Sequence, residues 1–237
     1  MPSSLTLSLL RLPRTDARWR HLDAYGAHRL VWSGFPGLAD AERPFLFSHD
    51  TRGDARHGVQ SLLVQSTVPP DWAVLGSAAD VQTKTVDAAA LVAGTRVGFA
   101  LRANPTVARD GFSDGKRRRI GVGTNPELAF QRMGRPWPAS GEEVEAWRRE
   151  TLADWLARAG ARGGFAVEGV EASPAVARRV VRSTPGGQRT ERPMTLHEVE
   201  FSGVLHVTDA AAFAETRAGG LGRGRSFGFG LLLLRPA

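Results

Sequence analysis

The residues best suited to catalysis are a tyrosine and a histidine near the N-terminus. Tyr25 is the only tyrosine of the chain, and His28 follows it by three residues. On a helix, this spacing brings both side chains to one patch of the surface. An imidazole exchanges protons at neutral pH and a phenol donates a hydrogen bond, so the pair suits acid–base chemistry. By itself the spacing favours a solvated histidine beside an amphipathic tyrosine over catalysis, and His21 is a rival on the same predicted face.

Other catalytic chemistries are poorly represented in the sequence. The chain has no cysteine, which excludes disulfides, thiolate metal sites and cysteine nucleophiles. His49 and His57 flank Asp50 and Asp54, but this arginine-bearing segment predicts a surface loop rather than a metal site. The glycine-rich stretch 219–230 has neither a GK[ST] nor a GxGxxG signature, and it leads from a helix into a strand, the reverse of a phosphate loop. We therefore expect no metal and no other cofactor.

Positive charge is concentrated in three parts of the chain. The sequence contains 29 arginines but only two lysines, and its net charge is +7. Residues 96–135, 174–195 and 217–235 together carry +14, so the remaining residues carry −7. This polarity is typical of a protein that binds a polyanion, and nucleic acid is the leading candidate partner. The alternative is three solvated basic faces on unrelated surfaces.

The composition indicates an ordinary globular protein of one large or two small domains. The chain has 237 residues, of which 42% are hydrophobic and 23% are charged. Its apolar runs, Leu5 to Leu10 and Leu231 to Leu234, are too short to span a bilayer, and no basic residue precedes the first. We therefore expect a cytoplasmic protein without membrane contact.

The hydrophobic pattern predicts a β-α-β-β-α-β order that occurs twice. The first set of elements is predicted at 5–9, 16–31 with Thr15 as N-cap, 45–48, 59–66, 71–75 and 81–85. The second set is predicted at 95–103, 142–159, 165–171, 197–207, 209–217 and 227–234. This order indicates an α+β protein with two tandem ferredoxin-like, RNA-recognition-type domains. We place them at residues 1–90 and 91–237.

Two basic inserts interrupt the second half. Residues 104–138 are rich in loop-forming residues and carry the cluster Lys116 to Arg119, and residues 173–193 predict a projecting hairpin with 176–182 as one arm. The hairpin has little apolar surface to bury, which favours contact with a partner over a flexible, solvated loop. In the glycine-rich stretch, Arg223 and Arg225 lie among glycines, which indicates backbone held against RNA or against the facing domain.

Several segments in this order resemble the CRISPR-associated RNA-processing endoribonucleases of the CasE type. They are YGAH at 25–28, LLVQSTVPPDWAVL at 62–75, FALRANPT at 99–106, GKR at 115–117, FSGVLHV at 201–207 and GLGRGRSFGFG at 220–230. Each is weak alone, but their order and spacing along nearly the whole chain are specific. The family fold is a tandem pair of ferredoxin-like domains, in agreement with the predicted repeat.

The resemblance implies binding of the CRISPR repeat stem-loop and one metal-independent cut of precursor CRISPR RNA at the base of the stem. The cut would leave a 2′,3′-cyclic phosphate and a 5′-hydroxyl, and the product would stay bound. His28 and Tyr25 fall on the family's catalytic pair; whether His28 is the acid or the base stays open. The RNA-binding residues implied by the family motifs, by the hairpin and by the glycine-rich stretch are Arg102, Lys116, Arg117, Arg119, Arg178, Arg179, Arg182, Arg189, Arg223 and Arg225.

Three functions remain open at this point. The leading one is a stem-loop-specific endoribonuclease that also serves as a subunit of a Cascade-type interference complex, as the resemblance implies. The second is a non-catalytic RNA-binding subunit of a ribonucleoprotein with the same fold. The third is a basic DNA-binding or scaffold protein. The first two differ only at the site of His28 and Tyr25.

Overall fold

The computed structural model describes residues 4–38, 43–50, 58–88, 90–109, 118–180 and 194–237. The first half builds a four-stranded sheet in the order β2-β3-β1-β4, in which each described pairing is antiparallel. Its elements are β1 (Ser4–Pro13), α1 (Ala24–Trp32), β2 (Phe45–Asp50), β3 (Val59–Ser66), the 3-10 turn η3 (Ala73–Leu75) and β4 (Asp80–Asp87).

The second half builds a second sheet in the order β11-β5-β10-β8, with β9 paired to the first part of the long strand β10. Its main elements are β5 (Arg96–Ala103), α3 (Gly141–Arg162), β8 (Phe165–Ala172), β9 (Val176–Val180), β10 (Met194–Val207), α4 (Ala210–Gly219), the 3-10 turn η4 (Arg225–Phe227) and β11 (Leu232–Pro236). The first insert contributes β6 (Thr106–Arg109), β7 (Arg118–Gly121) and α2 (Pro126–Arg132).

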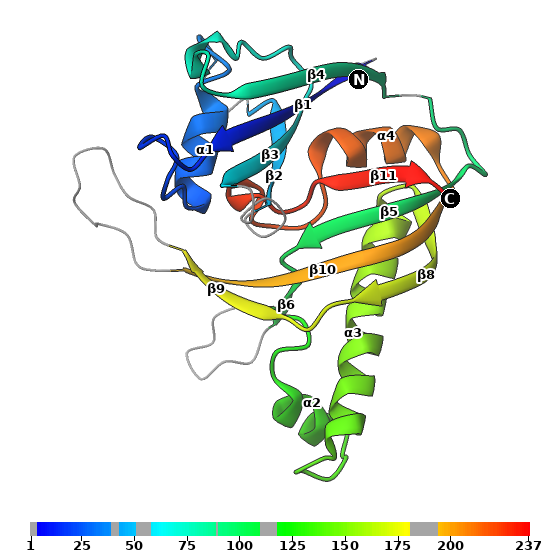
Figure 1. The fold of residues 1–237 in the computed structure, drawn as a ribbon. Coiled ribbons are helices and arrows are strands. Elements are labelled where there is room, and N and C mark those ends of the chain that lie inside the picture. The colour runs from blue at the N-terminus through cyan, green and yellow to red at the C-terminus, as the bar shows by residue number, and fades with distance from the viewer. Residues whose placement is uncertain (1–3, 39–42, 51–57, 89, 110–117, 181–193) are drawn as a thin grey trace.

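Both sheets have the same connectivity, and this confirms the predicted fold class. In each half, the first and third strands of the β-α-β-β-α-β unit lie at the centre, and the second and fourth lie at the edges. The result is two tandem ferredoxin-like units, whose sheets lie one above the other in Figure 1. We propose that the domains are residues 1–90 and 91–237, because the first sheet ends at Asp87 and the second begins at Arg96.

Among the predicted elements that differ in extent, two begin five or more residues late. The helix expected over 16–31 begins only at Ala24, because the side chain of Asp23 caps it by accepting a hydrogen bond from the Gly26 backbone N–H at 2.6 Å. Upstream, the backbone turns, and Trp19 is buried in the core of the first half. The strand expected over 227–234 starts at Leu232, since η4 occupies the beginning of that range.

Each half has its own hydrophobic core. In the first, Ala27 and Val31 of α1 pack with Phe45, Phe47 and other apolar residues of the sheet. In the second, residues of α3 pack with the apolar face of the second sheet, and the Trp155 ring stacks on Phe201 with their centroids 5.7 Å apart. Among the described helices, none is both long and apolar enough to cross a membrane.

The glycine-rich loop, residues 219–230, joins the two halves. Its turn η4 packs on α1 and β2, so the segment lies against the facing domain, one of the two alternatives predicted from the sequence. Several of its glycines have positive φ, and Gly228 has a φ of 81°. A Cβ at Gly228 would lie 3.2 Å from Phe47, a residue of the first core. Only glycine therefore allows the loop to approach β2 this closely.

We expect the substitution Gly228→Ala to weaken the contact between the halves. Alanine at this position would both strain the backbone and press on Phe47, at a cost of about 1 to 3 kcal/mol in the free energy of unfolding. Chemical denaturation measures this loss. The control is Gly219→Ala, at which an added Cβ meets nothing within 4 Å. Equal stability of the two variants would contradict this account of the loop.

Candidate active site and nucleic-acid interface

Tyr25 and His28 lie one turn apart on α1, as their spacing predicts. Both side chains are half-buried, and their ring centroids are 6.4 Å apart. The His28 ring also lies 5.7 Å from Phe45 and 6.3 Å from Phe47, centroid to centroid. His21, in contrast, is exposed in the turn before the helix, so the expectation that it shares the helical face of His28 is wrong.

Three segments that are distant in sequence meet at Tyr25. Its side chain packs against a small cluster formed by Leu196 of β10 and by Phe227 and Phe229 of the glycine-rich loop. Val180, the last residue of β9, packs against the same cluster. The base of the basic hairpin and the glycine-rich loop therefore flank the tyrosine of the candidate catalytic pair. Figure 1 shows α1 and β9 approaching the red loop that carries η4.

Arg43, which the sequence analysis did not single out, belongs to this region. Its Nη1 donates a hydrogen bond to the Ser226 hydroxyl in η4, at 2.9 Å. Burial, and after it the charge of nearby Arg225, lower the pKa of Arg43 from its ordinary value. Arg43 thus contacts the residue next to Arg225, and the two positive charges repel each other, an arrangement that favours an anion near them. No short motif marks Arg43, so only the fold reveals this neighbourhood.

His49 has a structural role. It is 6% exposed, and its Nε2 lies 3.1 Å from the Gln60 side-chain oxygen. The amide nitrogen of Gln60 donates to the Trp19 carbonyl, so the Gln60 oxygen accepts the N–H of a neutral His49. Burial lowers the pKa of His49 in spite of this hydrogen bond. His57 and Asp54 lie outside the described residues, among which no group of three His, Asp or Glu side chains is placed to hold a metal.

The predicted RNA-binding arginines occupy different environments. Arg119 on β7, Arg179 on β9 and Arg223 in the glycine-rich loop are exposed. Arg178 on β9 is also exposed, but its Nε donates to the carboxylate of buried Glu198 at 3.0 Å. Arg225 is half-buried and donates to the Gly219 carbonyl. The charges of Arg119, Arg179 and Arg223 are available to a ligand. Arg178 and Arg225 use part of their hydrogen-bonding capacity within the protein.

Arg102 connects the two sheets. From β5 its Nη2 donates to the His49 carbonyl on β2 at 2.7 Å and to the Ser48 hydroxyl at 3.3 Å. Burial lowers the pKa of its guanidinium, while Glu198 and then other nearby carboxylates oppose the shift. The structure therefore gives Arg102 a contact between domains that its motif did not predict. The remaining predicted RNA-binding residues lie outside the described residues: Lys116, Arg117, Arg182 and Arg189.

The family comparison matches nearly the whole chain. A family model described as CRISPR associated protein covers residues 5–236. The chain belongs to this family. Among curated relatives, the CRISPR system Cascade subunit CasE of Escherichia coli is 29% identical over 90% of this chain and 92% of its own length. The CRISPR-associated endoribonuclease Cse3 of Thermus thermophilus is 28% identical over 74% of this chain and 72% of its own length.

A solved structure of a CRISPR-associated protein shares the fold. The CRISPR endoribonuclease Cse3 bound to a 19-nucleotide RNA superposes with a TM-score of 0.70, at 26% identity, over 98% of this chain and 100% of its own. This CRISPR-associated chain is therefore of the CasE type, as the sequence motifs indicated. The roles given to individual residues of the site are predictions from the sequence and the geometry.

The pKa of His49 predicts a loss of stability in mild acid. Above its ordinary value of 6.5 the group is neutral in both states. As the pH falls below that value, the unfolded chain takes up a proton that folded His49 resists, so the free energy of unfolding decreases by up to about 1.4 kcal/mol per pH unit. Denaturation of His49→Gln between pH 7 and pH 5 should show a smaller decrease. Parallel curves would contradict the prediction; His197 contributes equally to both proteins.

Removing the Arg102 guanidinium should loosen the two domains. Arg102→Met leaves the His49 carbonyl without this charged donor, and we expect a cost of about 1.5 to 3 kcal/mol in the free energy of unfolding. Arg96→Met is the matched control on the same strand, because the Arg96 side chain is 62% exposed and its ion pair with Glu168 lies at the surface. If both variants lose the same stability, the connection through Arg102 is not structural.

Proposed function

We propose that this protein is an endoribonuclease that binds the stem-loop of a CRISPR repeat and cuts precursor CRISPR RNA at the base of the stem. One observation carries the proposal. In a chain of the CasE type, the Tyr25–His28 pair, the glycine-rich loop and the base of the basic hairpin meet at one place. A histidine beside phosphate-binding groups is the arrangement that RNA cleavage by proton transfer requires.

The reaction we propose is an attack of a ribose 2′-hydroxyl on the adjacent phosphorus. The new bond closes a 2′,3′-cyclic phosphate while the bond to the 5′-oxygen breaks, and that oxygen leaves with a proton as a 5′-hydroxyl. One proton leaves the attacking oxygen and one reaches the departing oxygen, so the cut is a net rearrangement that consumes no water. The chemistry needs in-line geometry and proton transfer, which protein side chains can supply. Metal independence is part of the proposal.

His28 transfers a proton in this scheme, and Tyr25 donates a hydrogen bond to the phosphate or its oxygens. The rings of Phe45 and Phe47 fix the imidazole from the core side, so it meets the RNA in a defined orientation. Arg43 and Arg225 lie by η4, next to the same helix, and stabilise the negative charge that develops on the phosphate.

The basic residues hold the RNA in place. Exposed Arg179, Arg119 and Arg223 contact phosphates, as do Lys116 and Arg117 of the GKR motif. By the resemblance, Arg178, Arg182 and Arg189 of the sequence-predicted hairpin would face the stem. In an A-form stem the major groove is narrow, so most of these contacts add affinity and salt dependence rather than sequence specificity.

The cleaved RNA stays bound, which makes the protein a subunit as well as an enzyme. CasE of Escherichia coli is named as a subunit of Cascade, and its similarity spans 90% of this chain. We propose that other subunits of a Cascade-type complex join this protein through the RNA it retains. A site of action in the cytoplasm follows from the proposed substrate.

The test is cleavage of a labelled CRISPR repeat stem-loop by His28→Ala. We expect the cleavage rate constant to fall at least about 100-fold, because a proton-transfer group typically contributes that much or more, while the affinity for the stem-loop changes little. Single-turnover assays with excess enzyme measure the rate, and gel mobility measures binding. Tyr25→Phe keeps the ring and its packing, so a slower cut by this variant reports on the hydroxyl alone.

The same assays with EDTA test metal independence. The matched control is His21→Ala, which removes an exposed imidazole just before the same helix. Wild-type protein should make one cut with and without EDTA and leave a cyclic phosphate. Cleavage by His28→Ala at the wild-type rate would refute the site. Tight binding without any cut by the wild-type protein would instead identify a non-catalytic subunit.

A further inference from the structure

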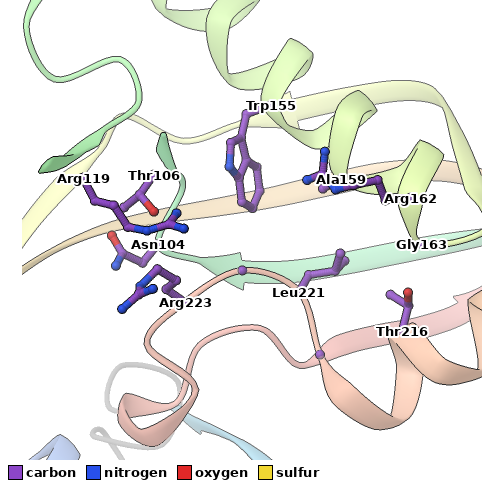
Figure 2. A pocket seen from close by; sticks show the side chains of 12 residues that line it. Asn104, Thr106, Arg119, Trp155, Ala159, Arg162, Gly163, Thr216, Leu221 and Arg223 are labelled. Carbon is purple, nitrogen blue, oxygen red and sulfur yellow. The ribbon is translucent and has the colours of Figure 1, made fainter. Parts of the chain in front are cut away.

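A second basic region lies in the second half, away from the core that surrounds His28. Two adjoining cavities, of about 280 and 430 Å³, share Thr106 and Arg119 in their walls. The first lies between α3, β7 and the glycine-rich loop, and the second extends along the β6–β7 hairpin to α2. We call the pair the arginine groove. Figure 2 shows the first cavity, with Arg119 and Arg223 at one end and Arg162 at the other.

The charge of this groove is entirely positive. Its walls contain five arginines and one histidine but no described Asp or Glu: Arg109, Arg119, Arg132, Arg162, Arg223 and His197. None of the five arginines forms an ion pair with a described residue, whereas Arg96 and Arg148, outside the groove, each pair with a glutamate. Guanidinium groups gathered without carboxylates favour a ligand that brings several negative charges.

The groove is too small for a duplex. Cavities of this volume are comparable with small-ligand pockets, which measure roughly 300 to 1,000 Å³, so each accommodates about one nucleotide. Its walls also offer groups suited to unpaired bases. The edge of Trp155 and the side chains of Thr106 and Thr216 line the first cavity, and the His197 ring lines the second. Trp155 is 8% exposed and stacks on Phe201, so it offers a base its edge, whereas His197 is half-buried. A positively charged groove that follows the backbone is typical of single-strand binding.

The groove is connected to the candidate active site through the glycine-rich loop. Arg223 forms a β-bridge with Asn104 at the groove, and four residues later Phe227 packs in the cluster that contacts Tyr25. Asn104 is 5% exposed, and its side-chain oxygen accepts the backbone N–H of His197 at 2.9 Å. One short segment thus fixes both the groove wall and the neighbourhood of Tyr25.

We propose that the arginine groove binds the single-stranded RNA that flanks the repeat stem, with its arginines on consecutive phosphates. The inference rests on the proposed function, because it assigns a place to a second part of the same substrate. Arg109, Arg132, Arg162 and His197 become RNA-contacting residues beyond those that the sequence motifs indicate. The stem itself stays outside the groove, since the cavities admit only an unpaired strand.

The test compares stem-loop RNAs with and without single-stranded flanks in binding to the full chain. The variant is Arg132→Ala combined with Arg162→Ala, both exposed residues of the groove that have no proposed part in the cut. Its matched control is Arg149→Ala combined with Arg158→Ala, which removes two exposed positive charges from α3 outside the groove walls. Thermal unfolding shows that both double variants fold.

We expect the wild-type protein and the control to bind flanked RNA about tenfold or more tightly than blunt stem-loop, and the groove variant to lose this margin. For flanked RNA, the slope of the logarithm of the binding constant against the logarithm of the salt concentration should become less steep by about 1.4, because two phosphate contacts on a single strand are lost. Affinity for the blunt stem-loop should change less than about twofold. Separate upstream and downstream flanks show which side of the stem enters the groove.

Other outcomes overturn the inference. The groove does not bind the flank if the groove variant still prefers flanked over blunt RNA by the wild-type factor. The same conclusion follows if the variant loses affinity equally for both RNAs. A wild-type protein that cuts the stem-loop but gains nothing from either flank refutes the groove alone and leaves the proposed function intact; an acidic protein partner would give this result. A wild-type protein that neither binds nor cuts the stem-loop refutes both.

Discussion

The contact between the glycine-rich loop and the first helix is the interaction on which the rest of the site depends. Phe227 and Phe229 belong to the second half, yet they pack against Tyr25 of the first. Without this contact, the pair would keep the neighbours that its own domain supplies, such as Phe45 and Phe47 beside His28, and Tyr25 would lose those from the second half. The loop approaches so closely because glycines such as Gly228 take positive φ beside Phe47. The positive φ of glycines in the second domain therefore determines which side chains surround Tyr25 in the first.

Arginine serves two separate purposes in this protein. Arg102 is half-buried and uses its fork of donors to join β5 to the backbone of β2, which stabilises the pair of domains. In contrast, Arg119, Arg162 and Arg223 face a cavity without any described carboxylate in its walls, and their charge is left for a ligand. Composition alone cannot separate these uses, because both appear as basic residues within positively charged stretches. Burial and the position of acceptors distinguish them.

Much of the fold follows from local pattern. The order of elements, the tandem ferredoxin-like class and several strand limits were predicted, and β3 matches its predicted range of 59–66. The errors have local causes that override periodicity. Asp23 caps α1 and so delays its start, and the positive-φ glycines around η4 delay β11. In β1, Thr6 and Ser8 are buried, while Leu7 and Leu9 line cavities between the two sheets. These leucines point away from the core of their own domain because the second domain lies on that face of the sheet.

By itself, the sequence determined the class of fold and the basic character of the second half, and it singled out Tyr25 and His28 as the pair proposed to be catalytic, because spacing on one helix and the order of short motifs are local properties. The tertiary structure decided which distant groups meet. Arg43 approaches Arg225 across 182 positions of sequence, and Arg162 joins Arg119 and Arg223 around one cavity. No motif encodes these neighbours, since they result from two sheets that pack together through loops and long side chains.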